Sequence, residues 1–142
     1  MKVFKSVSRA LLAATLLFSA AAYAEVAVIV SASNANASLD ENTISRIFLG
    51  KISKFPDGSQ AIPVDQNEGS ASRDAFNEKV LGKSSSQLKA YWSRLIFTGK
   101  GTPPKESGSD ADIKNLVAQN PNLVGYVDAS AVDASVKVVY KF

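Results

Sequence analysis

An N-terminal segment with the pattern of a secretory signal limits how much of this 142-residue chain is left to fold. Three basic residues within positions 1–9 precede an apolar run over residues 10–22, and Ala22-Tyr23-Ala24 has the small-x-small pattern of a cleavage site. The run is too short and wrongly flanked for a membrane span. We therefore expect cleavage after Ala24, a periplasmic location, and a mature chain of residues 25–142 that folds as one domain.

Composition excludes several classes of function. The chain has no cysteine and no histidine, which excludes cysteine nucleophiles, Ser-His-Asp triads, zinc sites and disulfide scaffolds. The net charge of +3 comes from the three basic residues of the signal, so the mature chain is neutral. Neutrality gives no sign of the long-range attraction that nucleic-acid binding needs. We expect no cofactor, no metal and no nucleic acid, and a fold held by its apolar core alone.

Apolar periodicity and turn residues predict alternating strands and helices along residues 25–142. Strands are expected near residues 25–31, 61–64, 123–127 and 136–142, and helices near 40–49, 73–81, 84–98 and 110–119. Asp40, a serine of 84–86 and Asp110 are the expected N-caps, with a capping box of Ser38 and Glu41 as a rival start for the first helix. This order predicts an α/β domain with a small, mixed, mostly parallel sheet flanked by helices.

A polar loop over residues 65–72, between a strand and a helix, is the strongest candidate for a binding site. Gly69 permits a tight backbone there, and the first amides of the following helix point outward without partners, a geometry that binds anions. Ser70 and Ser72 would add hydroxyl donors, and Arg73 a fixed positive charge.

Purely structural roles explain the same residues equally well. Ser70 would then cap a helix, and Arg73 would be a solvated surface charge. Glu68 would repel a fully ionised anion, but it could accept the proton of an oxyanion such as hydrogen phosphate. In the structural reading, Glu68 is a loop residue whose charge is stabilised by the nearby helix dipole. Tyr91 and Trp92, at helical spacing with Leu88 and Leu95, are expected in the core and not in a stacking platform.

Four segments, in this order, carry a resemblance to a known family. They are Ile47-Phe48-Leu49-Gly50-Lys51-Ile52, Pro63-Val64, Gly69-Ser70-Ala71-Ser72-Arg73-Asp74-Ala75-Phe76, and Gly125-Tyr126-Val127. Together they resemble the substrate-binding proteins of bacterial phosphate ABC transporters, over most of the mature chain. The resemblance implies the fold of a type 2 periplasmic binding protein, of which this chain supplies about one lobe.

The resemblance also implies site residues. Ser70 and Ser72 match the family's phosphate-binding serine and threonine, with Gly69 in the loop and Arg73 at the arginine that often follows. Glu68 matches the acidic residue that accepts the phosphate proton. Two positions depart from the family pattern: Ala71 replaces a glycine, which restricts the backbone, and Gln66 replaces an arginine that neutralises phosphate.

The leading hypothesis is non-enzymatic binding of inorganic phosphate or a similar oxyanion at Gln66 to Arg73, related to phosphate ABC transport. Half a cleft leaves the anion solvated on one side, so we expect weak binding unless a transporter permease, another periplasmic protein or a second copy in a homodimer closes it. The alternative is a lobe without ligand binding that acts as an adaptor or sensor module. Loop amides converging with Ser70, Ser72 and Arg73 would favour binding, and an internal ion pair of Arg73 would favour the module.

Overall fold

The computed structural model describes residues 25–142, so the expected signal segment and its cleavage site lie outside the described residues. The elements follow in the order β1 (Val26–Ser31), α1 (Glu41–Phe48), β2 (Ile62–Asp65), α2 (Ala71–Phe76), a π-helical segment (Asn77–Leu81), α3 (Ser85–Phe97), β3 (Lys105–Glu106), α4 (Asp110–Gln119), β4 (Leu123–Asp128), a 3₁₀ turn (Ala129–Ala131) and β5 (Val136–Lys141). Strands and helices alternate as the sequence predicts.

The described strands form one mixed sheet of five, in the order β3-β2-β4-β1-β5. The strand pairs β3-β2 and β2-β4 are parallel, whereas β4-β1 and β1-β5 are antiparallel. The mixed α/β sheet confirms the expected fold class, although parallel pairs do not outnumber antiparallel ones. The reason is that β1 and β5, the first and last strands, both pair antiparallel within the sheet.

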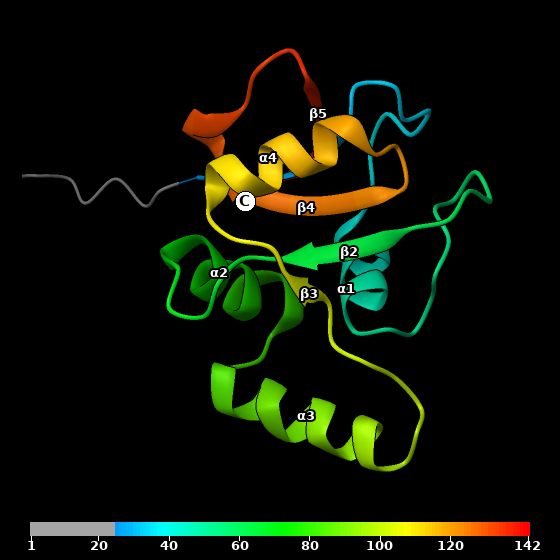
Figure 1. Ribbon diagram of the computed structural model, residues 1–142, viewed down its shortest axis with the longest axis vertical. Coiled ribbons are helices and arrows are strands. Elements are labelled where there is room, and N and C mark those ends of the chain that lie inside the picture. The colour runs from blue at the N-terminus through cyan, green and yellow to red at the C-terminus, as the bar shows by residue number, and fades with distance from the viewer. Residues whose placement is uncertain (1–24) are drawn as a thin grey trace, which may run out of the picture.

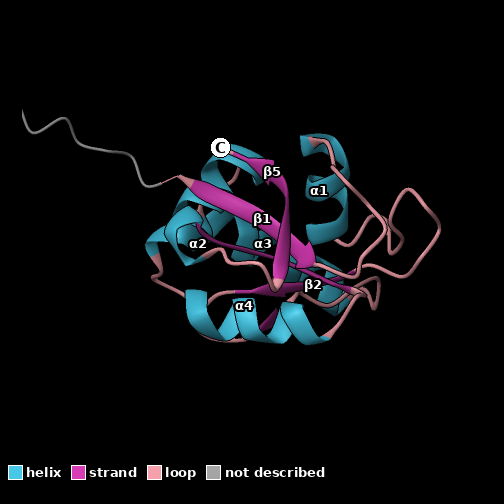
Figure 2. Ribbon diagram, turned by 90° about the horizontal axis from the view of Figure 1, so that it is seen from above, coloured by secondary structure: helices cyan, strands magenta, loops and turns pink. Residues whose placement is uncertain are grey.

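Helices cover both faces of the sheet, with α4 on one side and α1 and α2 on the other (Figures 1 and 2). All six residues of β1 are buried, because the strand is covered on both faces. Its alternate side chains pack in two separate apolar clusters, with Val28 in the cluster under α1 and Ile29 in the cluster under α4. Gly125 of β4 allows α4 to approach closely, because a Cβ there would lie 2.7 Å from Cγ2 of Ile113.

Three aromatic rings form the centre of the cluster under α1 and α2. Phe76 stacks on Tyr126 with ring centroids 4.2 Å apart, and Phe48 meets the edge of Phe76 at 4.6 Å. All three side chains are buried. Because Phe76 is the last residue of α2, this stack fixes the helix, and the loop in front of it, against β4.

Local chemistry sets where the helices begin. Asp40 caps α1, and Ser84 forms a capping box with Gln87 at α3, as expected, so the rival box of Ser38 and Glu41 is not used. At α4 the cap is Ser109, which corrects the expected Asp110 by one residue. The second helix begins at Ala71, two residues earlier than expected, because Ser70 caps it.

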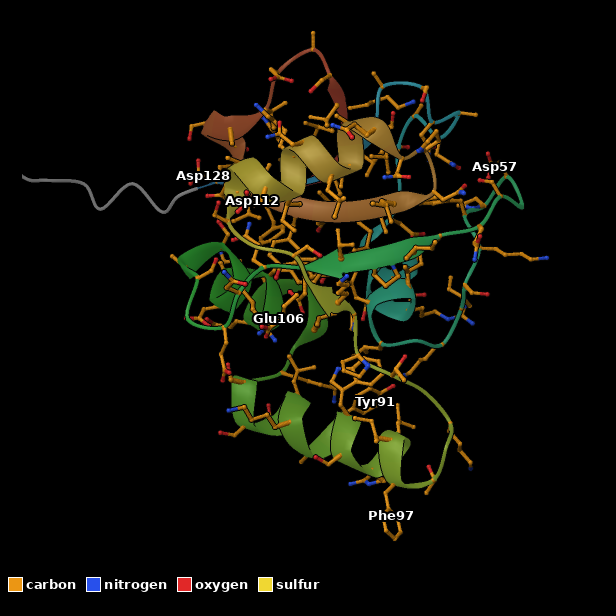
Figure 3. The ribbon with its side chains drawn as sticks, in the orientation of Figure 1. Asp57, Tyr91, Phe97, Glu106, Asp112 and Asp128 are labelled. Carbon is orange, nitrogen blue, oxygen red and sulfur yellow. The ribbon has the colours of Figure 1, made fainter. Side chains whose placement is uncertain are left out.

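Helix α3 stands apart from the sheet and projects from the rest of the domain (Figure 1). The expectation that its apolar face is core holds only for Leu88; Tyr91, Trp92 and Leu95 are half-buried. Ile96 is 54% and Phe97 92% exposed, and Phe97 points away from the body of the domain (Figure 3). The apolar periodicity is that of a core helix, but the remaining elements do not extend far enough to cover it.

Among residues 25–142, no helix combines the length and the apolar character needed to cross a lipid bilayer.

The aromatic stack predicts a large and local stability effect. Phe76→Ala should lower the free energy of unfolding by about 3–5 kcal/mol, because it removes a fully buried ring and leaves a cavity. The measurement is equilibrium urea unfolding of residues 25–142. Phe97→Ala, the same substitution at an exposed ring, is the matched control and should change stability by less than about 0.5 kcal/mol. Equal effects at the two positions would contradict this description of the core.

Candidate functional site

The predicted loop leaves the carboxyl end of β2 and leads directly into α2. Gly69 has a φ of 88°, in the left-handed region that favours glycine, and this conformation turns the chain into the helix. Two backbone bonds hold the loop region to the segment before α4, from Asn67 N to the Gly108 carbonyl at 3.0 Å and from Ser107 N to the Asp65 carbonyl at 2.8 Å. The start of the loop is therefore fixed to the chain before α4.

Gln66 lies inside the protein and is 1% exposed. Its Nε2 donates to Asp110 Oδ1 at 2.7 Å and to the Tyr126 carbonyl at 2.9 Å, while its Oε1 accepts from the Ser70 hydroxyl. Gln66 thus joins β2, β4, α2 and α4, and its amide donors are used within the fold.

The two loop serines also make internal hydrogen bonds. Ser70 Oγ accepts from Arg73 N at 3.2 Å and so acts as the N-cap of α2. Ser72 is buried, and its hydroxyl donates to Asp110 Oδ1 at 3.3 Å. Ala71, the first residue of α2, is exposed, and the amides of Ala71 and Ser72 precede the one that Ser70 caps and have no acceptor within the helix.

Arg73 is held between two carboxylates. Its Nη1 donates to Glu106 Oε1 at 2.6 Å and to the Gln66 carbonyl at 2.9 Å, and its Nη2 lies 3.7 Å from Asp65 Oδ2. Burial lowers the pKa of Arg73, but the bond to Glu106 and the charge of Asp65 outweigh it and raise that pKa above its usual value. The guanidinium is therefore a permanent cation in an intramolecular ion-pair cluster. This arrangement is the one expected of an adaptor or sensor module, and not of an arginine that is free to bind an anion.

Asp65 connects this cluster to the aromatic core. Its Oδ1 accepts a hydrogen bond from the Tyr126 hydroxyl, and Gln66 N donates to the same oxygen at 3.1 Å. Burial raises the pKa of Asp65 above its usual value, although the Tyr126 bond and the Arg73 charge oppose the shift. Burial, and then the charge of Asp65, raise the pKa of Tyr126 as well, so the tyrosine stays a neutral donor.

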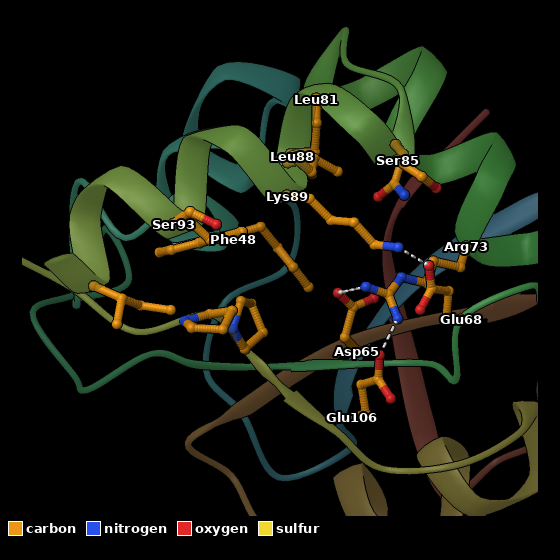
Figure 4. Close-up of a pocket in the computed structure, with 15 residues that line it drawn as sticks. Phe48, Asp65, Glu68, Arg73, Leu81, Ser85, Leu88, Lys89, Ser93 and Glu106 are labelled. Atoms are coloured by element: carbon orange, nitrogen blue, oxygen red, sulfur yellow. Dashed lines mark hydrogen bonds and ion pairs between the residues drawn. The ribbon is translucent and has the colours of Figure 1, made fainter.

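Glu68 lies at the exposed edge of this network (Figure 4). It is exposed and forms an ion pair with Lys89 of α3, with Oε1 and Nζ 2.8 Å apart. The hydrogen bond and charge of Lys89 lower the pKa of Glu68, which keeps the carboxylate ionised. The structure therefore brings Gln66, Ser70, Ser72 and Arg73 together, and it leaves the Glu68 carboxylate beside Arg73 but paired with Lys89.

Sequence reasoning missed the acidic partners of the loop. Asp65 and Asp110 receive most of its donors, and Glu106 binds Arg73 from a strand only two residues long. Figure 3 shows Glu106 at the middle of the domain, beside β2 and α2. Sequence offers one usable signal, since Asp65 ends a strand and ligands of α/β folds lie beyond the carboxyl ends of strands. Nothing in the sequence pairs Glu106 with Arg73. Within residues 25–142, no three acidic side chains gather as a metal site.

The site has fewer free hydrogen-bond donors for an anion than its residue types suggest. Its hydroxyls and Arg73 Nη1 donate to protein acceptors, so the backbone donors open to a ligand are the first amides of α2 beside the exposed Ala71. Asp65 lies against Arg73, with 3.7 Å between its Oδ2 and Nη2. An oxyanion would therefore bind through backbone amides and compete with a neighbouring carboxylate.

No protein-family model and no curated protein matches this chain. Solved structures do. A candidate phosphate ABC transporter substrate-binding protein from Clostridium perfringens, with bound phosphate, aligns over 82% of this chain with 28% identity and a TM-score of 0.66. An ABC-type phosphate transport receptor from Vibrio cholerae aligns over 82% of this chain with 22% identity and a TM-score of 0.63. PstS from Borrelia burgdorferi aligns over the same share with 11% identity and a TM-score of 0.59.

The chain spans only 45%, 46% and 47% of the length of these three proteins. This coverage fits a single lobe of the two-lobed fold. The resemblance to phosphate ABC transporter substrate-binding proteins is therefore confirmed, and the fold is that of one periplasmic binding protein lobe.

The raised pKa of Asp65 predicts a pH dependence of stability. An acid whose pKa is higher in the folded state stabilises the fold at low pH, and this contribution is lost as the pH rises through the folded pKa. Because the pKa of Asp65 lies above the ordinary aspartate value of 3.8, the stability of the natural protein relative to Asp65→Asn should fall as the pH rises above that value, as measured by urea unfolding at each pH.

Asp112→Asn is the control with the opposite sign. Hydrogen bonds from the backbone and side chain of Ser109 lower the pKa of Asp112, so the natural protein should gain stability relative to that variant as the pH rises. The same trend in both variants would refute the assignment for Asp65.

Proposed function

We propose that the protein is an exported, non-enzymatic binding protein related to phosphate uptake, which holds phosphate or a similar oxyanion at the loop from Gln66 to Arg73. One observation carries the proposal: the chain is 28% identical, over 82% of its length, to a candidate phosphate-binding protein whose structure contains phosphate. Transport proteins of this kind bind and release a substrate without changing it. The periplasm, after cleavage behind Ala24, is the proposed location.

Binding would rest on the backbone at the start of α2. The helical run from Ala71 continues through the π-helical segment to Leu81, so the amides of its first turn carry the positive end of a helix dipole. Gly69 has no side chain to block that approach, and nothing lies within 4 Å of where its Cβ would be. With Arg73 already paired, we expect weak binding by the isolated lobe.

A second protein would close the cleft. A single lobe leaves the anion open to water on one side, where water screens each contact. A transporter permease, another periplasmic protein or a second copy of this chain would exclude that water and complete the site.

The second candidate function is an adaptor or sensor module that no longer binds the anion. Arg73 favours it specifically, because that side chain bonds Glu106 at 2.6 Å and lies 3.7 Å from Asp65. Freeing the guanidinium for a ligand would leave the Asp65 carboxylate buried without its cation, at a large cost. In this role the lobe would act by docking on a membrane or periplasmic partner.

Thermal unfolding of residues 25–142 with phosphate, with sulfate at matched ionic strength as control, separates the two functions. A ligand at ~100 times its dissociation constant adds about 2.7 kcal/mol and moves the midpoint by several degrees. Phosphate should raise the midpoint, and Ala71→Pro should abolish the rise, because proline removes one amide yet is tolerated at the first position of a helix.

Ser85→Pro is the matched control, since Ser85 is the first residue of α3 and its cap, Ser84, is also extended. This variant should keep the full response to phosphate. No shift in the natural protein, up to tens of millimolar phosphate, would reject anion binding and favour the adaptor.

A homodimer with two loops face to face is the simplest way for this chain to close its own site. We expect sedimentation equilibrium to show a monomer that dimerises when phosphate is added, because the anion would then be held from both sides. A strictly monomeric profile combined with tight phosphate binding would rule out this arrangement.

A further inference from the structure

Residues 79–105, which include α3, carry only positive charges, although the charges of residues 25–142 balance. Neither aspartate nor glutamate occurs in this stretch, and its cations are Lys79, Lys83, Lys89, Arg94, Lys100 and Lys105. Because α3 projects from the rest of the domain (Figure 1), the cations of this helix lie at one end of the molecule. A protein without net charge can thus attract an anionic surface to that end.

Helix α3 is anchored to the domain along the side that faces it. Leu88 is buried there, and the Tyr91 hydroxyl donates to the Leu49 carbonyl at 2.7 Å. Lys89 reaches from the helix to Glu68, with 2.8 Å between Nζ and Oε1, as the dashed line in Figure 4 shows. These contacts hold the helix in place, so its other side and its end face outward in a fixed position.

The outward side of α3 ends in apolar side chains next to free cations. Phe97 follows Leu88 by nine residues, about two and a half helical turns, which places it on the opposite side of the helix. Its ring is 92% exposed and points away from the domain (Figure 3), and the neighbouring Ile96 is 54% exposed. Arg94 and Lys100 are exposed, and neither side chain has a partner among residues 25–142. These four residues are here called the α3 tip.

A second copy of this chain does not fit the α3 tip. In a two-fold dimer the same patch lies on both sides of the interface, so the cations of one tip would face those of the other. No acid within residues 79–105 would offset them, and like charges brought together destabilise an interface.

An anionic lipid surface matches both features of the α3 tip. Arg94 and Lys100 are attracted by its negative charge, and each cation near such a surface strengthens binding. Phe97 and Ile96 can enter the boundary between headgroups and acyl chains, where the apolar side chains of interfacial helices lie. A lipid layer is fluid and needs no preformed pocket for a projecting ring, whereas a protein partner has to supply one.

We propose that the α3 tip docks this protein on a membrane surface that contains anionic phospholipids. Phe97 and Ile96 insert into the interface, and Arg94 and Lys100 donate to lipid phosphate groups. The contact is peripheral and reversible, because only the side chains at one helix end enter the lipid. It goes beyond the proposed oxyanion function, since it uses side chains outside the loop from Gln66 to Arg73 and does not depend on that loop.

Co-sedimentation of residues 25–142 with lipid vesicles tests the proposal. One set of vesicles contains equal parts of phosphatidylglycerol and phosphatidylcholine, and the control set contains phosphatidylcholine alone. Binding to the anionic set should be tighter by about tenfold or more. The difference should shrink as sodium chloride is raised from about 50 mM to about 500 mM, because salt screens the attraction. Equal binding to both sets would overturn the proposal, and no binding to either would overturn it in favour of an acidic protein partner.

Two variants test the residues of the α3 tip. Phe97→Ala should weaken binding to anionic vesicles by about tenfold, because it removes the inserted ring, and Arg94→Gln should weaken it several-fold. The matched controls are Leu116→Ala, at an exposed apolar side chain of α4, and Arg46→Gln, at an exposed arginine of α1. Both controls should bind as the natural protein does. Unchanged binding in Phe97→Ala, or equal losses in the two arginine variants, would refute the tip as the docking surface.

A fluorescent label reports which end of the protein meets the lipid. The chain has no cysteine, so Thr98→Cys and Asn115→Cys each supply a single site for a polarity-sensitive dye. Thr98 follows Phe97 directly, whereas Asn115 lies on α4, with β4 and β2 between it and α3 (Figure 1). With anionic vesicles, the emission should shift to the blue at residue 98 and not at residue 115. Any other pattern would contradict docking through the α3 tip.

Ala71→Pro separates this docking from the oxyanion site. That variant should lose its response to free phosphate and keep its affinity for anionic vesicles. Loss of vesicle binding in Ala71→Pro would mean that the loop binds the lipid phosphate groups, and would overturn the assignment to the α3 tip.

Discussion

The pairing of Arg73 with Asp65 and Glu106 is the interaction on which the rest of the site depends. The guanidinium comes from α2, the two carboxylates from the ends of β2 and β3, and Nη1 also bonds the Gln66 carbonyl. One cation thus joins three elements and holds the loop on a framework that the Asp65–Tyr126 hydrogen bond extends to the aromatic core. Because a charge buried without its partner costs several kcal/mol, Arg73 and Asp65, whose side chains are 19% and 14% exposed, cannot turn toward a ligand without a replacement partner.

This ion-pair arrangement explains what Gln66 does at a position where the resemblance to the family leads one to expect an arginine. Gln66 places a neutral side chain in the interior, where its amide bonds Asp110 and the Tyr126 carbonyl. The remaining positive charge, Arg73, is neutralised by carboxylates from elsewhere in the chain. If the proposed function holds, the lobe offers an anion backbone amides but little free positive charge, and a second protein would have to supply the rest. The first amides of α2, with Gly69 in front of them, would then be the main anion contacts.

Helix α3 has a different role from the one its apolar pattern indicates. It is capped and regular, yet most of its apolar side chains are half-buried or exposed. Its distance from the sheet leaves a cavity of about 470 Å³ lined by apolar side chains of α1, the π-helical segment and α3. Asp65, Arg73 and Glu106 line the same cavity, so a change in the ion-pair cluster would alter its polar wall.

The sequence by itself determined the parts of this protein that depend on neighbouring residues. Asp40 and Ser84 cap helices because an oxygen acceptor two or three residues before an amide is sufficient, and the apolar run of β1 specifies a strand covered on both faces. The four motifs between Ile47 and Val127, taken in their order, were enough to indicate the fold family. Only the tertiary structure decided that Glu106, 33 residues after Arg73, binds it, that Gln66 turns inward to Asp110, and that α3 lies away from the core. These outcomes depend on which groups, far apart in the sequence, come into contact when the sheet assembles. A local sequence pattern carries no information about such long-range contacts.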